Sequence, residues 1–308
     1  MSKYLIKGAS LYGEKVADIL IEDGVISRIA ENIDAADAQV VEAAGQVALP
    51  GLVDIHTHLR QPGYEASETV ETGTRAAALG GYTAVFAMAN SLPVADTAAV
   101  VEQVDRLGKE SAWCRVQPIG AVTVGLKGER LSDIGGMANS TANVRVFSDD
   151  GMCVYDPAVM RRALEYVKTF DGVIAQHAQE PRLTEGAQMN EGKVSADLGL
   201  TGWPAVAEEA IIARDVLLAE HLDSKLHICH LSTKGSIEVV RWAKSRGVKV
   251  TAEATPHHLL LTDETARTYD PIFKVNPPLR TEEDVMALRQ AVADGIIDVI
   301  GTDHAPHP

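Results

Sequence analysis

The sequence predicts an α/β fold in which a (β/α)₈ barrel, residues 51–308, follows a small β unit, residues 1–50. Three observations predict it. The first 50 residues contain short strands and turns. From Leu52 onward, eight apolar runs of strand length recur, most of them followed by a helical stretch. The chain length of 308 residues suits one large domain with a small appendage. A doubly wound open sheet is the alternative, but no glycine-rich phosphate loop follows the first run.

The N-terminal unit is predicted from three segments with strand character. They are YLIKGAS at 4–10, ADILIEDGVISRIA at 17–30 and QVVEAAGQVALPG at 39–51. Asp23-Gly24 interrupts the second segment, and this dipeptide favours the tight turn of a β-hairpin. We therefore expect a small antiparallel unit before the barrel.

The eight barrel strands are predicted from apolar runs rich in β-branched residues. These runs occupy residues 52–56, 82–88, 115–122, 144–148, 172–177, 225–231, 248–253 and 298–302. Helix starts support the alternation of strands and helices. Asp156-Pro157 has the pattern of an N-cap followed by proline at the first helical position, and Thr281 precedes three acidic residues of a first turn.

The composition argues for a small-molecule substrate. There are 28 Lys and Arg against 43 Asp and Glu, a formal net charge of −15, whereas nucleic acids and anionic membranes attract clustered positive charge. No apolar run reaches the roughly 18 residues of a membrane span, and the first residues lack a signal-peptide pattern. Three widely spaced cysteines (114, 153 and 229) fit a reducing compartment. We expect a cytoplasmic protein.

Candidate metal ligands fall where the predicted strands end. His56-Thr57-His58 closes the first strand, and on an extended chain residues i and i+2 point to the same side. Both imidazoles can therefore reach one ion. Taken alone, an HxH motif is as easily a pair of loop histidines.

The spacing of further ligand-type residues strengthens the metal interpretation. A barrel of this class allots about 31 residues to each βα unit. Asp150 follows the HxH motif by about three units, and His177 follows Asp150 by about one. His230 comes one unit plus an insertion later, and Asp303 two units plus an irregular stretch. These residues therefore fall at the ends of the first, fourth, fifth, sixth and eighth strands.

Four imidazoles and two carboxylates suit a pair of divalent ions better than a single ion, with zinc favoured by the nitrogen content. Such pairs are commonly bridged by a carboxylate. On the strand VRVFSDD, Asp150 has the parity of the small residues Val144, Val146 and Ser148, which favours it as the bridge. Parity can fail at a strand end, so Asp149 stays an alternative bridge. Either aspartate could also be an ordinary carboxylate in a turn.

Seven motifs give the chain a specific resemblance that extends along its whole length. They are HTHLRQPG (56–63), MAN (88–90), FSDDG (147–151), QHAQE (176–180), HICHLST (227–233), KVNPPLR (274–280) and GTDHAPH (301–307). Together they resemble the dihydroorotases of the amidohydrolase superfamily, specifically the bacterial type I enzymes. The resemblance implies a barrel of the amidohydrolase type with a small β-sandwich formed by the N-terminal strands. It also leads us to expect that the C-terminal part of the family fold is absent, the chain ending after the eighth strand.

The resemblance assigns roles to ten positions. It implies that His56 and His58 bind the first metal and that His177 and His230 bind the second. Asp150 bridges them, and Asp303 is both a metal ligand and the catalytic base. The implied substrate-binding residues are His58, Arg60, Asn90, Asn276 and His307.

Several of these residues have ordinary readings when the resemblance is set aside. Asn90 and Asn276 would be assigned to loop turns, and Arg60 to the surface, although a guanidinium can bind a substrate carboxylate through two hydrogen bonds. His227 is out of phase with His230 on its strand, which predicts a packed histidine. His257 and His258 are expected to cap a helix or loop.

The implied function is that of a dihydroorotase, a zinc-dependent hydrolase of cyclic amides in pyrimidine (UMP) biosynthesis. It interconverts N-carbamoyl-L-aspartate with L-dihydroorotate and water, using two divalent metal ions. A homodimer and a complex with aspartate carbamoyltransferase are compatible with the resemblance, and the sequence decides neither.

Two rival functions are weighed against it. Hydantoinases and allantoinases usually carry a carboxylated lysine where this chain has FSDDG, and they do not need a carboxylate-binding arginine. A non-catalytic subunit of a carbamoyltransferase complex should have lost part of the metal set, whereas all ten positions are filled here.

Overall fold

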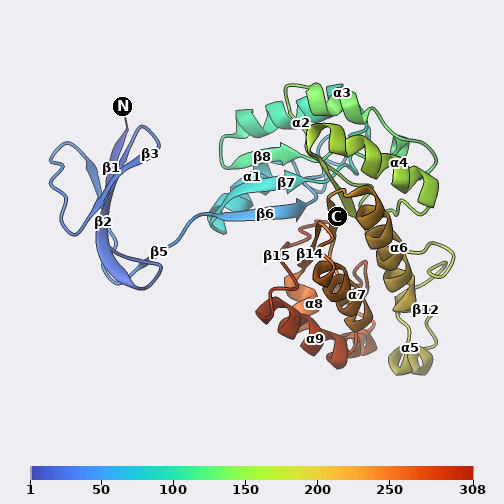
Figure 1. The fold of residues 1–308 in the computed structure, drawn as a ribbon. Helices are drawn as coiled ribbons and strands as arrows, with labels where there is room; N and C mark the ends of the chain where they lie inside the picture. The colour runs from blue at the N-terminus through green and yellow to red at the C-terminus, as the bar shows by residue number, and fades with distance from the viewer. Residues whose placement is uncertain (1, 308) are drawn as a thin grey trace. The chain divides into compact units, whose positions relative to one another are not determined.

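The computed structural model describes residues 2–307, which have mixed α/β structure and divide into two compact units. The first unit ends at Leu52 and the second begins at Val53. Figure 1 shows the strands of the first unit in dark blue and the alternating strands and helices of the second in the remaining colours.

The N-terminal unit is one five-stranded sheet in the order β3-β2-β1-β4, with β5 also paired to β1. Its strands are β1 (Lys3–Leu11), β2 (Lys15–Glu22), β3 (Val25–Ala30), β4 (Gln39–Glu42) and β5 (Val47–Ala48). The predicted hairpin turn joins β2 to β3, with positive φ values of 49° at Asp23 and 81° at Gly24. The sheet is not wholly antiparallel as expected, because β4 and β5 run parallel to β1.

Each of the eight predicted strands of the second unit is present. They are β6 (Leu52–Thr57), β7 (Tyr82–Ala87), β8 (Arg115–Pro118), β9 (Val146–Phe147), β10 (Val173–Gln176), β13 (Leu226–Ile228), β14 (Val250–Ala254) and β15 (Val299–Ile300). One sheet has the order β6-β7-β8 and the other β9-β10-β13-β14-β15. Parallel bridges from Gly120 to Phe147 and from Thr57 to His304 connect the two sheets at both ends. The strands therefore follow one another in chain order around a ring.

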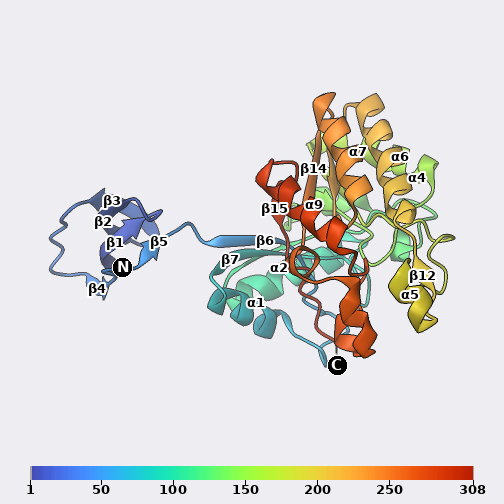
Figure 2. The same ribbon diagram turned by 90° about the horizontal axis from the view of Figure 1, so that it is seen from below.

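Helices follow most of the strands. The longer ones are α1 (Val70–Leu79), α2 (Ala98–Ser111), α4 (Pro157–Val167), α6 (Val206–Leu222), α7 (Lys234–Ser245) and α9 (Glu282–Ala293). Short helices are α3 (Ile134–Asn139), α5 (Lys193–Leu198) and α8 (Pro256–Leu260), with 3₁₀ turns at Val124–Leu126, Lys168–Phe170, Asp263–Thr268 and Pro271–Phe273. In Figure 2, α7 lies beside β14, and α7 also packs against α6 and α9. A small parallel pair, β11 (Met189–Asn190) and β12 (Gly202–Trp203), forms in the predicted insertion.

The predicted helix starts have the expected caps. The Asp156 carboxylate accepts hydrogen bonds from Ala158 N at 2.7 Å and Val159 N at 2.9 Å. Thr281 forms a capping box with Asp284. These caps fix where α4 and α9 begin. No helix within residues 2–307 is both long enough and apolar enough to cross a membrane.

The main core of the second unit lies between the strands and their helices. It includes fully buried Phe147, Ile174, Ile212, Leu226 and Ile228. This packing fixes the strands from which the candidate site residues project, and those residues lie at the carboxyl ends of the strands.

Candidate active site

Six predicted ligand residues come together where β6, β9, β10, β13 and β15 end. They are His56 and His58 on or just after β6, Asp150 after β9, His177 after β10, His230 after β13 and Asp303 after β15. The four histidines and Asp150 are buried, and the Asp303 side chain is 14% exposed. Residues separated by up to 247 positions therefore form one cluster.

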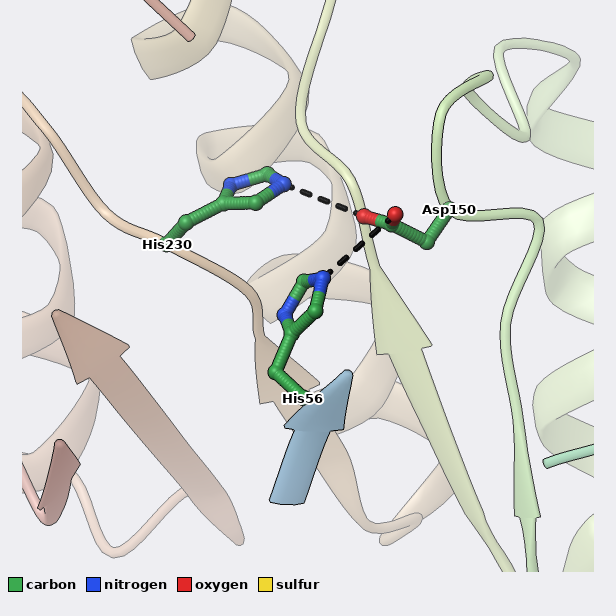
Figure 3. A group of neighbouring side chains, drawn as sticks. All are labelled: His56, Asp150 and His230. Carbon is green, nitrogen blue, oxygen red and sulfur yellow. Dashed lines mark hydrogen bonds and ion pairs between the residues drawn. The ribbon is translucent and has the colours of Figure 1, made fainter. Parts of the chain in front are cut away.

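Asp150 lies at the centre of this cluster. Its Oδ2 is 3.4 Å from His56 Nε2 and 3.2 Å from His58 Nε2. Its Oδ1 is 3.3 Å from His177 Nδ1 and 3.1 Å from His230 Nε2. Figure 3 shows His56 and His230 approaching the carboxylate from two sides. Each oxygen thus faces one of the two histidine pairs.

Asp303 joins the pair formed by His56 and His58. Its Oδ1 is 3.4 Å from His56 Nε2 and 3.1 Å from His58 Nε2. Asp303 has a φ of 52° and His230 a φ of 30°, in the left-handed region that non-glycine residues seldom adopt. Such backbone conformations persist where the surrounding structure enforces them, which is common at functional sites.

The donor atoms fit a divalent cation. Two ligands about 2.0–2.1 Å from a tetrahedral ion lie about 3.3 Å apart, which matches the nitrogen–oxygen distances around Asp150. His56 Nε2 is buried with no hydrogen-bond partner, and two carboxylate oxygens lie 3.4 Å from it. Ligating atoms of His56, Asp150 and His230 all lie within 4.8 Å of one another, as do those of His56, His58 and Asp303. Nitrogen and oxygen donors with this spacing suit zinc or a similar ion.

The charges within this cluster shift the pKa values of its titratable side chains. Burial alone would lower the pKa of His58, but hydrogen bonds to Asp150 and Asp303 raise it to about 9. Burial opposes ionisation of Asp150 too, yet the surrounding histidines hold its pKa well below the usual range. Without a cation, the raised pKa of His58 therefore favours its protonated form near neutral pH. Since a metal binds neutral imidazole, metal binding at His58 must release that proton.

Asp149, the alternative bridge, points to a different environment. Its Oδ1 accepts hydrogen bonds from Val122 N at 2.8 Å and Thr123 N at 2.9 Å, and its other oxygen accepts one from the Thr123 hydroxyl. Burial raises its pKa to about 6. Of the two adjacent carboxylates, Asp150 lies among the histidines and Asp149 supports the loop after β8.

Other side chains orient the histidines. His58 Nδ1 donates to Asn90 Oδ1 at 2.8 Å, and His177 Nε2 donates to Gln179 Oε1 at 2.9 Å. His56 Nδ1 is hydrogen-bonded to Glu253 on β14. Neither Gln179 nor Glu253 was predicted as a site residue from the sequence. The signal for Glu253 was a lone acidic residue in an otherwise uncharged strand ending.

The predicted substrate-binding residues line a cavity of about 810 Å³ above the cluster. His58, Arg60, Asn90, Asn276 and His307 all contribute to its wall, together with Asp150, His177 and Asp303. Arg60 Nε donates to Pro306 O at 3.0 Å, and its Nη2 is 3.4 Å from His307 Nε2. Lys274 also lines the cavity. Arg60 and Lys274 therefore line the same cavity as the carboxylates of Asp150 and Asp303, although Lys274 Nζ donates to Gln188 Oε1 at 2.7 Å.

The remaining histidines have other environments. His227 is packed, with Nδ1 2.8 Å from Thr251 Oγ1 and Nε2 3.4 Å from Glu253 Oε2. His257 and His258 do not cap a helix, because Thr255 is the N-cap of α8 and accepts from His258 N, but His258 does bind a loop carbonyl, as the loop alternative expected. The short hydroxyl of threonine reaches the first turn of the helix, whereas His258 donates from Nε2 to Pro277 O at 3.0 Å.

Comparison with known proteins identifies related sequences over the whole chain. The model of the dihydro-orotase-like family matches residues 45–236. The chain is 71% identical to the dihydroorotase of Streptomyces coelicolor over 308 residues, which cover 100% of this chain and 72% of that protein. It is 67% identical to the dihydroorotase of Leifsonia xyli subsp. xyli over 305 residues, covering 99% of this chain and 70% of the relative.

Solved structures share the fold at lower sequence identity. The L-hydantoinase (dihydropyrimidinase) from Arthrobacter aurescens superimposes with a TM-score of 0.83 at 24% identity, covering 100% of this chain and 70% of that one. The likeness concerns the arrangement of strands and helices.

Proposed function

The chain belongs to the dihydro-orotase-like family, and we propose that it catalyses the dihydroorotase reaction at the cluster around Asp150. It is a hydrolase that acts on a cyclic amide and interconverts L-dihydroorotate and water with N-carbamoyl-L-aspartate. The observation that carries the site assignment is the central position of Asp150 between two histidine pairs, beneath a cavity that contains Arg60.

We propose that two divalent ions, preferably Zn²⁺, bind there. His56, His58 and Asp303 would hold one ion, His177 and His230 the other, and Asp150 would contact both. When bound, such a pair lowers the pKa of a water molecule and polarises a carbonyl group. Asp150 keeps the two histidine pairs in register because each of its oxygens faces one pair.

Asp303 is the group proposed to move the proton. Its carboxylate lies on the cavity side of the cluster, and neighbouring His58 and His56 keep its pKa low although burial opposes ionisation. In hydrolysis, water oxygen bonds to the ring carbonyl carbon while Asp303 takes a water proton. The ring carbon–nitrogen bond then breaks, and Asp303 returns the proton to the departing nitrogen.

Arg60, Asn90 and His307 are proposed to bind the substrate carboxylate, and Asn276 to contact the ring from the opposite loop. Arg60 suits this role because a guanidinium binds a carboxylate through two parallel hydrogen bonds. Fixing the carboxylate orients the amide carbonyl toward the cluster, which lowers the entropic part of the barrier.

The wider assignments follow from the same proposal. We propose that the ring of eight strands is a (β/α)₈ barrel of the amidohydrolase type, that the five-stranded N-terminal sheet forms part of a small β-sandwich, and that the enzyme acts in pyrimidine biosynthesis in the cytoplasm. The three free cysteines, Cys114, Cys153 and Cys229, support a reducing compartment. The proposal also includes the formation of a homodimer and an association with aspartate carbamoyltransferase.

Substrate preference tests this function against its rivals. Purified protein supplied with Zn²⁺ should hydrolyse L-dihydroorotate, which carries a carboxylate, roughly 30-fold or more faster than uncharged dihydrouracil or hydantoin. That factor corresponds to a charged contact of about 2 kcal/mol. Arg60→Met should remove most of the preference. Faster hydrolysis of hydantoin would instead indicate a related cyclic amidase, and no turnover of any of the three would indicate a non-catalytic subunit.

A further inference from the structure

Beneath the cluster, one buried carboxylate connects groups from several strands. Glu253 on β14 is 1% exposed. Its Oε1 accepts hydrogen bonds from His56 Nδ1 and, at 3.0 Å, from His230 N. Its Oε2 lies 3.4 Å from His227 Nε2. Every described donor that it contacts lies on or just after β6 or β13, the strands that carry two of the candidate ligands.

The contact with His56 selects one form of the imidazole. When Nδ1 carries the hydrogen donated to Glu253, Nε2 presents its lone pair. Nε2 is the atom that lies 3.4 Å from both Asp150 Oδ2 and Asp303 Oδ1. A negatively charged acceptor at Nδ1 also makes the other nitrogen a better electron donor to a cation.

The contact with His230 brings in the other half of the cluster. His230 faces Asp150 Oδ1, whereas His56 faces Asp150 Oδ2. The single atom Glu253 Oε1 therefore restrains one ligand from each histidine pair. The bond to His230 N also holds a backbone whose φ is 30°.

The space around Glu253 is closed on the side of β15. A Cβ atom at Gly301 would lie 2.7 Å from Glu253 Oε2 and 3.2 Å from His56 Cβ. A side chain at this position would displace the carboxylate. Gly301, two residues before Asp303, has no side chain and thus leaves room for the Glu253 carboxylate.

We propose that Glu253 is a positioning residue for the metal pair, which fixes the imidazole form of His56 and the separation of His56 from His230. This inference rests on the proposed metal-dependent function. Acidic partners of ligating histidines typically change metal affinity 10–100-fold when they are replaced. A roughly 10–100-fold loss of metal affinity is expected here too. The side chains that accept from His58 and His177 are uncharged amides, so they would not replace the lost negative charge of Glu253.

The test measures Zn²⁺ binding itself. Glu253→Gln keeps the shape and one acceptor oxygen but removes the charge, so it should bind one of two Zn²⁺ ions roughly 10–100-fold more weakly in competition with a chromogenic chelator. Circular dichroism of the metal-free protein checks the fold. Should this variant not fold, Glu253→Asp, which keeps the charge but withdraws the oxygens, is expected to show the same loss.

Glu208→Gln is the matched control. Glu208 is 2% exposed and accepts hydrogen bonds from Ser232 N at 3.0 Å and Thr233 N at 3.2 Å, close to the same loop but without a histidine contact. It should keep wild-type Zn²⁺ affinity. Wild-type affinity in the folded Glu253 variant, or an equal loss in Glu208→Gln, would overturn the inference. If wild-type protein itself bound no Zn²⁺, the proposed metal function would fail instead.

Discussion

At the scale of single residues, the division of roles between Asp149 and Asp150 is the main result. The strand pattern favoured Asp150 by parity but left Asp149 open, because parity can fail where a strand ends. In the structure β9 ends at Phe147, so both aspartates lie beyond the regular strand. The three-dimensional contacts, and not the strand register, separate the pair.

Substitution of the two aspartates should have different consequences. Asp150→Ala should lose bound metal and activity, because both histidine pairs lose their shared carboxylate. Asp149→Ala should keep both, but its free energy of unfolding should fall by about 1–3 kcal/mol, since Val122 N and Thr123 N lose a buried acceptor. Elemental analysis, a dihydroorotate assay and urea unfolding check these outcomes. Metal loss in Asp149→Ala alone would move the bridge to that residue.

Asp303 should show the behaviour of a proton-transfer group. Asp303→Asn should retain metal, because four histidines and Asp150 remain, but should lower the rate of dihydroorotate hydrolysis by roughly 10²–10⁴-fold or more. The acidic limb of the pH–rate profile should disappear as well. A metal-replete variant with a rate within a few-fold of wild type would show that another group moves the proton, with His307 in the cavity wall as the first candidate.

At the scale of elements, the eight strands and two helix starts were predictable because each depends on a local pattern along the chain. Glu253 was not, because its relevance depends on His56, which lies 197 positions away on another strand. The same applies to the hydrogen bond from His58 to Asn90, which lies 32 positions further along the chain. Sequence periodicity predicts a strand, but not which side chains of neighbouring strands meet.

One helix contact gives a pH-dependent prediction. Asp215 on α6 is fully buried, and its Oδ2 accepts from Gln176 Nε2 at 2.8 Å, next to His177. Burial raises its pKa to about 6, although Arg214 opposes this. The folded protein thus holds a proton that the unfolded chain, with an ordinary carboxyl pKa, has already lost. The stability due to this group is present at low pH and is lost as pH rises through about 6.

Asp215→Asn isolates this effect. Between pH 5 and pH 7 the unfolding free energy of wild type should fall by about 1 kcal/mol relative to that of the variant. Urea unfolding of both proteins at the two pH values measures this difference. Unfolding free energies that change equally in the two proteins would show that Asp215 does not titrate between pH 5 and pH 7.

At the scale of the whole molecule, the distribution of function-bearing residues explains why the sequence was informative. The candidate residues are spread from His56 to His307, yet the six predicted metal ligands each lie at or just after the end of a strand, and the ring of strands brings those ends together. The net charge of −15 argued against polyanionic partners, whereas the fold decides which cationic residues, Arg60 and Lys274, line the cavity. Composition thus restricted the chemical class of the ligand, and the fold determined where cationic side chains can contact a negatively charged ligand.

The number of divalent ions bound per chain tests the central claim most directly. Purified protein incubated with Zn²⁺ and freed of excess metal should contain about two ions per chain by elemental analysis, since four histidines and two aspartates exceed the needs of one tetrahedral ion. Asp150→Ala, measured in parallel, should contain fewer. Wild-type protein that holds at most one ion after Zn²⁺ supplementation would contradict a paired site bridged by Asp150.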